Sequence, residues 1–113
     1  LRGRRPRLRR PAGGAMSRFA LTVAFTLHPG RLADFLPLMR ENARQSLAAE
    51  PGCRVFEVAR PAAGAPDAVF LWEVYDDRAA FDAHLASDHF RAFDAATAPM
   101  VAGKTVAFYT LEP

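Results

Sequence analysis

The chain has 113 residues, half of them hydrophobic and 11% aromatic, which favours one globular domain and excludes a disordered protein. Its net charge of +3 is unevenly distributed, because residues 1–15 carry six arginines and no acidic side chain. Residues 16–113 therefore hold nine basic and 12 acidic side chains, a net charge of −3 that argues against nucleic acid as a partner.

The basic segment 1–15 has no apolar periodicity and is predicted to be a disordered tail. Such an arm could bind the phosphates of a nucleic acid or a membrane, but upstream or artificial sequence before a natural start at Met16 is the favoured interpretation. The apolar run at 19–27 is too short to span a membrane and lacks a signal-peptide cleavage site, so it is interpreted as a strand. Because Cys53 is the only cysteine, no intrachain disulfide can form, and a cytoplasmic protein with no membrane partner is expected.

Beyond the tail, hydrophobic periodicity and turn residues divide the chain into strands and helices. The predicted elements are a strand at 18–27, a helix at 31–49, strands at 53–60 and 67–75, two short helices within 76–99 and a strand at 104–111. Asp76 or Asp77 is expected to cap the first short helix, and Ser87 or Asp88 the second. This β-α-β-β-α-β order, with the second helix broken in two, predicts a ferredoxin-like α+β domain over 16–113 with a four-stranded antiparallel sheet.

The predicted sheet has apolar residues on both faces. Along the third strand, Val69, Leu71 and Tyr75 alternate with Phe70, Trp72 and Val74. Helices cover only one face of such a sheet, so the second face needs another cover. The sequence therefore predicts a homodimer whose sheets pack face to face.

Polar side chains interrupt the apolar faces of the predicted helices. Asn42 and Ser46 project into the apolar arc of the long helix, and His84 falls between Ala80 and Phe81 on the next one. His89 opens the last helix beside further aromatic residues. Buried polar groups need partners, so these side chains either bond to neighbouring elements or line a cavity.

Glu73 lies within an apolar strand, where burial would raise the pKa of its carboxyl and make it a candidate acid or base. An ion pair with an arginine such as Arg54 is the structural alternative. The sequence has no glycine-rich phosphate loop, no Cys/His cluster at metal spacing and no serine nucleophile motif. Glu73, His84 and His89 could hold a metal ion, but nothing in the sequence constrains their geometry, and we expect no metal and no cofactor.

Two segments together resemble the antibiotic biosynthesis monooxygenase family, namely Asn42-Ala-Arg-Gln-Ser-Leu-Ala-Ala-Glu-Pro-Gly-Cys-Arg-Val-Phe56 and Tyr75-Asp-Asp-Arg-Ala-Ala-Phe-Asp-Ala-His-Leu-Ala-Ser-Asp-His-Phe90. The resemblance implies a dimeric α/β barrel that oxidises a phenolic or quinol-like aromatic molecule with O2 and without a cofactor. It implies that His84 or His89 accepts the hydroxyl proton and that Asn42 binds the resulting oxyanion. The expected substrate-binding residues are Ser46, Phe56, Trp72, Glu73, Phe81 and Phe90.

Two other functions remain open. Asn42, Ser46, the Glu50-Pro-Gly turn and the two histidines are also similar to the autoinducer-2-processing branch of the same superfamily, which implies an isomerase of a small phosphorylated carbonyl compound. The candidate phosphate anchors would then be generic, namely Arg40, Arg44, Arg54 and Arg91. The third possibility is a non-catalytic dimeric ligand-binding module. Oxygen consumption distinguishes the monooxygenase from both.

Overall fold

The computed structural model describes residues 18–113, so the predicted tail and its boundary at Met16 lie outside the described residues. The elements are β1 (Phe19–Leu27), α1 (Leu32–Ala49), β2 (Cys53–Ala59), β3 (Ala68–Tyr75), α2 (Arg78–Leu85), α3 (Asp88–Thr97), a 3₁₀ turn (Ala98–Met100) and β4 (Val101–Thr110). Their order and the division of the second helix confirm the prediction. β4 begins three residues earlier than expected, because Val101 already pairs with Leu27 beyond a register shift.

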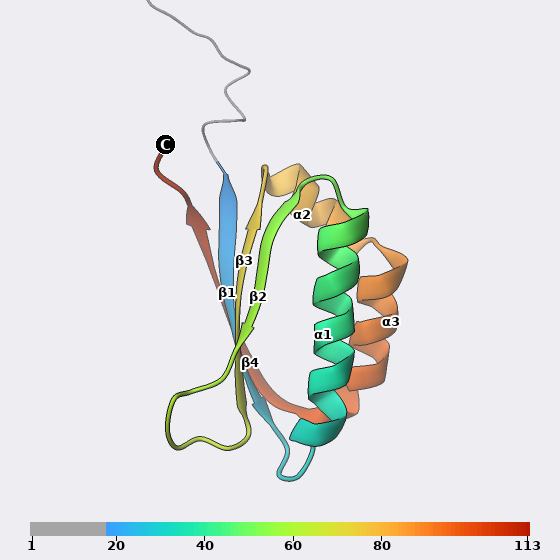
Figure 1. Ribbon diagram of the computed structural model, residues 1–113, viewed down its shortest axis with the longest axis vertical. Helices are drawn as coiled ribbons and strands as arrows, with labels where there is room; N and C mark the ends of the chain where they lie inside the picture. The colour runs from blue at the N-terminus through green and yellow to red at the C-terminus, as the bar shows by residue number, and fades with distance from the viewer. Residues whose placement is uncertain (1–17) are drawn as a thin grey trace, which may run out of the picture.

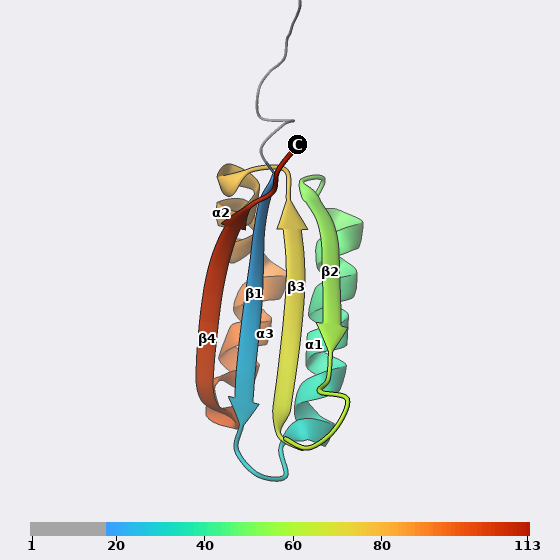
Figure 2. The same cartoon turned by 90° about the vertical axis from the view of Figure 1, so that its left-hand side faces the viewer.

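The four strands form one antiparallel sheet in the order β2-β3-β1-β4, and all helices lie on one face of it (Figure 1). Figure 2 shows the opposite face, on which no helix of residues 18–113 lies. This two-layer arrangement is the predicted ferredoxin-like α+β fold. Within residues 18–113, no helix combines the length and the apolar character that crossing a membrane requires.

The core lies between the sheet and the inner faces of α1 and α3. Phe35 of α1 is fully buried, with its ring 5.2 Å from that of Phe25 on β1 and 5.8 Å from that of Phe93 on α3. Met39 follows one turn later on the same face of α1. Each such side chain contributes about 1.5–3 kcal/mol by leaving water, which holds α1 and α3 to the sheet.

The predicted caps fix the two short helices. Asp77 Oδ1 accepts a hydrogen bond from the Ala80 N–H at 2.8 Å and starts α2. Ser87 Oγ accepts from the Phe90 N–H at 3.2 Å and donates to the His84 carbonyl at 2.7 Å. One serine hydroxyl therefore starts α3 and ties it to the last turn of α2.

A glycine allows α2 to approach the turn that follows α1. A Cβ atom added at Gly52 would lie 2.6 Å from the Cβ of Ala80, closer than two carbon atoms can pack. Only glycine permits this approach without a shift of the helix. The close packing brings the end of α1 beside the helix that carries His84.

Candidate functional site

A cavity of about 480 Å³ lies between the helix-facing side of the sheet and helices α2 and α3. Its volume falls in the range of small-molecule sites. Most of its wall is apolar, formed by residues that include Leu21, Val23, Phe25, Met39, Phe56, Leu71, Phe81, Phe90, Phe93 and Phe108. The lining residues Val106 and Phe108 are 38% and 51% exposed, and both belong to the edge strand β4. The cavity is therefore reached along β4.

His84 is the buried imidazole of this wall, with 2% of its surface exposed. Its ring lies 5.0 Å from the ring of Phe90 and 5.5 Å from that of Tyr75. The Nδ1 atom is 2.8 Å from Glu50 Oε2, and because a carboxylate only accepts, Nδ1 carries the proton of this bond. Among the described residues, Nε2 has no hydrogen-bond partner. Burial lowers the pKa of His84 below its usual 6.5, although the bond to Glu50 opposes this effect.

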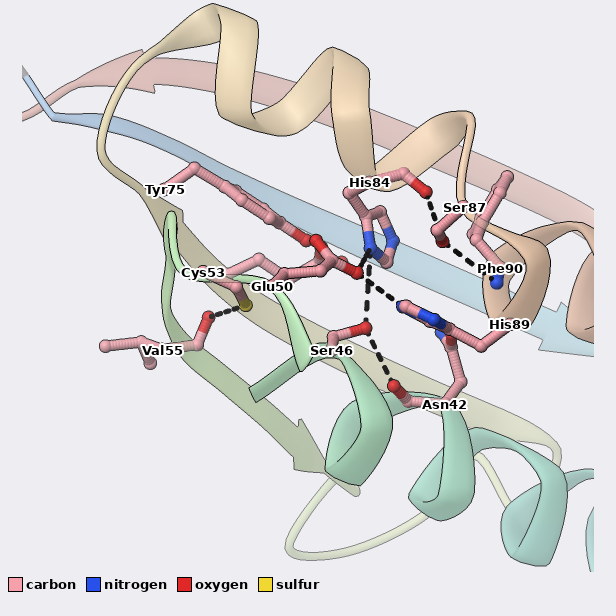
Figure 3. A network of polar contacts seen from close by, with 11 residues as sticks. Asn42, Ser46, Glu50, Cys53, Val55, Tyr75, His84, Ser87, His89 and Phe90 are labelled. Carbon is pink, nitrogen blue, oxygen red and sulfur yellow. Dashed lines mark hydrogen bonds and ion pairs between the residues drawn. The ribbon is translucent and has the colours of Figure 1, made fainter. Parts of the chain in front are cut away.

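Glu50 joins both predicted histidines (Figure 3). Its Oε2 atom also contacts Nε2 of His89, so one carboxylate oxygen accepts from two imidazoles. The two histidines are five residues apart, and in one continuous helix they would point about 140° away from each other. The break at Ser87 removes this restriction, because it places His84 at the end of α2 and His89 at the start of α3.

The polar pair of α1 lies beside the histidines. Ser46 Oγ donates to the Asn42 carbonyl at 2.7 Å and lies 3.4 Å from His84 Nδ1. Asn42 lines the cavity and is 4% exposed, and its Oδ1 atom has no hydrogen-bond partner among the described residues. A buried amide oxygen without a partner costs about 1–3 kcal/mol, which a ligand with a suitably placed hydroxyl would recover.

Glu73 lines the same cavity from β3 and is 3% exposed. Tyr75 donates its phenolic proton to Glu73 Oε1 at 2.7 Å. Burial raises the pKa of Glu73 to about 7, against the lowering effect of this hydrogen bond. The alternative of an ion pair with Arg54 is wrong, because Arg54 binds Asp76, with its Nε 2.6 Å from Asp76 Oδ1. Glu73 is thus a carboxyl that titrates near neutral pH inside an apolar cavity.

The structure brings most of the predicted site residues together. Those that line the cavity are Asn42, Phe56, Glu73, Phe81, His84 and Phe90. Ser46 and His89 do not line it and contact the polar groups behind His84. Trp72 faces the other side of the sheet, where its ring lies 6.4 Å from that of Tyr109. Adjacent residues of a strand point to opposite faces, so Trp72 and Glu73 cannot both line one cavity.

The residue that the sequence interpretation missed is Glu50. The grouping of Glu73 with His84 and His89, which the sequence left open but did not favour, does not form, because Glu50 and not Glu73 lies between the two histidines. The sequence interpretation treats Glu50 only as part of the turn that ends the helix. The spacing of the polar residues could have identified Glu50. Asn42, Ser46 and Glu50 recur every four residues and so share one face of α1 and its C-cap.

Comparisons with known proteins agree with this architecture. The family model described as antibiotic biosynthesis monooxygenase matches residues 18–96. A candidate antibiotic biosynthesis monooxygenase from Bacteroides thetaiotaomicron is 25% identical, with a TM-score of 0.76 over 88% of this chain and 91% of that one. Another from Caulobacter crescentus is 24% identical, with a TM-score of 0.75 over 88% and 92% of the two chains. Comparison with curated protein sequences gave no match.

Proposed function

Because the chain belongs to the antibiotic biosynthesis monooxygenase family, we propose that it oxidises a phenolic or quinol-like aromatic molecule with O2, without a cofactor. The observation that most supports this proposal is the hydrogen bonding of His84 on the cavity wall. Its Nδ1–H is held by Glu50, which leaves Nε2 as a proton acceptor beside an apolar cavity. Because burial lowers the pKa of His84, the imidazole is neutral at pH 7 and ready to accept a proton.

The proposed reaction begins with transfer of the substrate hydroxyl proton to His84 Nε2. The Asn42 amide then hydrogen-bonds the resulting oxyanion, and the rings of Phe56, Phe81 and Phe90 hold the aromatic body. Deprotonation makes the substrate electron-rich enough to reduce O2 directly. One oxygen atom forms a new bond to a substrate carbon as C–H bonds break, and the other leaves as water. All four electrons and both hydrogens of that water come from the substrate.

Oxygen uptake by the chelator-treated protein tests this function, with a panel of hydroquinones, anthrones and related phenols as substrates. We expect enzyme-dependent uptake with one O2 consumed for each substrate oxidised, and one atom of labelled oxygen in the product. Uptake that equals the rate without protein across the panel would contradict the proposal. Binding of these compounds without uptake would instead favour the non-catalytic ligand-binding module.

A second candidate function rests on Glu73. A carboxyl whose pKa is about 7 and an imidazole acceptor line one cavity, which is the arrangement that moves a proton between two carbons. This pair favours the isomerase of a small phosphorylated carbonyl compound. The predicted arginine anchors do not line the cavity, but Arg78 and Lys104 do. An isomerase would convert its substrate without consuming oxygen.

We also propose that the chain forms the predicted homodimer through the open face of the sheet. Phe70 and Tyr109 on that face are 41% and 47% exposed, and Trp72 lies beside Tyr109. Light scattering should give twice the 12.4 kDa chain mass, and Trp72→Glu should give monomers because it places a charge in the interface. Leu47→Glu is the control, since Leu47 is an apolar residue with 46% of its surface exposed, similar to Tyr109, but lies on α1. A monomeric wild-type protein would contradict this assembly.

A further inference from the structure

We propose that Glu50, His84 and His89 form a binding site for a divalent transition metal such as Zn²⁺. Each residue offers one ligand atom, and these three atoms lie within 4.8 Å of one another. Two imidazoles and one carboxylate are a donor set that zinc accepts, with its fourth position left to water or a ligand. The three side chains are 3%, 12% and 13% exposed for His84, His89 and Glu50, so the site is enclosed but reachable.

The geometry requires only small side-chain movements to receive the ion. Tetrahedral zinc with ligands at about 2.1 Å holds neighbouring donor atoms about 3.4 Å apart. His84 Nδ1 and Glu50 Oε2 now lie 2.8 Å apart, so they would separate by a fraction of an ångström. The ligands come from the end of α1, the end of α2 and the start of α3. Each ligand therefore lies at a helix end, and the ligand atoms, now within 4.8 Å of one another, would adjust by small side-chain movements.

A second observation indicates that hydrogen bonding alone leaves this cluster incomplete. Both imidazoles bind the same oxygen, Oε2, while Glu50 Oε1 is buried with no hydrogen-bond partner among the described residues. An unpartnered carboxylate oxygen is costly in a buried position. A metal ion provides a partner for this carboxylate and replaces the two imidazole protons that now converge on one atom.

Cys53, the only thiol of the chain, does not belong to the site. Its sulfur contacts the Val55 carbonyl at 4.0 Å and is not among the three clustered ligands. Burial raises the pKa of Cys53 to about 12, so the thiol keeps its proton and is a poor metal ligand.

Metal binding would change whether His84 Nε2, which faces the cavity, carries a proton. The consequence for activity rests on the proposed function. A neutral imidazole that binds the metal through Nδ1 carries its proton on Nε2. His84 would then donate a hydrogen bond into the cavity and could not accept the substrate proton. Occupation of the site is therefore expected to inhibit the monooxygenase reaction.

Competition with a chromophoric chelator tests the site, using the full chain without an affinity tag and Zn²⁺ as the probe. We expect one ion per chain. His89→Ala should weaken binding by more than the roughly 10–100-fold that loss of an outer-sphere partner costs. His89→Gln provides a second variant in case His89→Ala does not fold. Binding that survives both substitutions, or no saturable binding by the wild-type chain, would overturn the proposal.

The chain offers matched controls and a separate activity readout. His28 is the third histidine and is exposed in the turn after β1, so His28→Ala should bind Zn²⁺ as the wild type does, as should Cys53→Ser. Loss of binding in His28→Ala would place the site elsewhere. Oxygen uptake is then measured with and without one equivalent of Zn²⁺. Failure of uptake in the metal-free protein would reject the proposed function but leave the binding result intact.

Discussion

Replacing His84 with glutamine is expected to lower turnover of the oxygen-consuming reaction by roughly 10²–10⁴-fold, the usual contribution of a general base. Glutamine fills much of the imidazole volume and its amide can still donate to Glu50, but it cannot accept the substrate proton. Steady-state oxygen uptake measures the change, and circular dichroism verifies the fold. His28→Gln is the matched control, because His28 is exposed and does not line the cavity.

The pH dependence provides an independent test of the same role. Only neutral His84 accepts a proton, and burial lowers its pKa below 6.5. The wild-type rate should therefore be constant near pH 7 and fall only as the pH drops through a value below 6.5. A His84→Gln enzyme with full activity, or a wild-type rate that already falls with a midpoint above pH 6.5, would contradict this role of His84.

Replacing Glu73 with glutamine is expected to raise the free energy of unfolding by up to about 3 kcal/mol at pH 8 and to change it little at pH 4. Burial raises the pKa of the Glu73 carboxyl from 4.5 to about 7 in the folded protein. Below pH 4.5 the carboxyl is protonated in both the folded and the unfolded chain, so its burial does not involve a charge and does not lower stability. As the pH rises from 4.5 through 7, it ionises first in the unfolded chain, so the wild-type protein loses stability. Above pH 7 the loss is constant.

Urea unfolding of both proteins at pH 4, 6 and 8 measures this effect. The side-chain carbonyl of the introduced glutamine can still accept the Tyr75 hydroxyl, so the comparison isolates the cost of the charge. Glu57→Gln is the matched control, because Glu57 is exposed on the neighbouring strand β2. A stability difference that is the same at all three pH values would show that Glu73 is not held as a neutral acid.

The fold could be predicted from local signals, because each element is encoded within its own segment. Strand alternation, the helical periodicity of 31–49 and the caps at Asp77 and Ser87 act over a few residues and survive in the structure. The predicted start of β4 is too late, because its pairing with Leu27 depends on a register shift between strands far apart in sequence. The homodimer remains a prediction.

The candidate site was less predictable, because it depends on distances between elements. The positions of His84 and His89 near aromatic residues identify both as candidates, but their common partner cannot be deduced from either helix. Glu50 reaches them because Gly52 lets α2 pack closely against the turn after α1. That close approach depends on tertiary packing, so it cannot be predicted from any single segment of the sequence.

The break between α2 and α3 affects how the shape of the cavity can change in evolution. In the proposed mechanism, proton transfer depends on Glu50 and His84, at the ends of α1 and α2. Much of the cavity wall belongs instead to α3 and β4, including Phe90, Phe93, Thr97, Val106 and Phe108. Substitutions in the last quarter of the chain can therefore reshape the space for a ligand while the Glu50–His84 contact stays in place. This part of the cavity wall can therefore change in evolution while the proposed proton acceptor is retained.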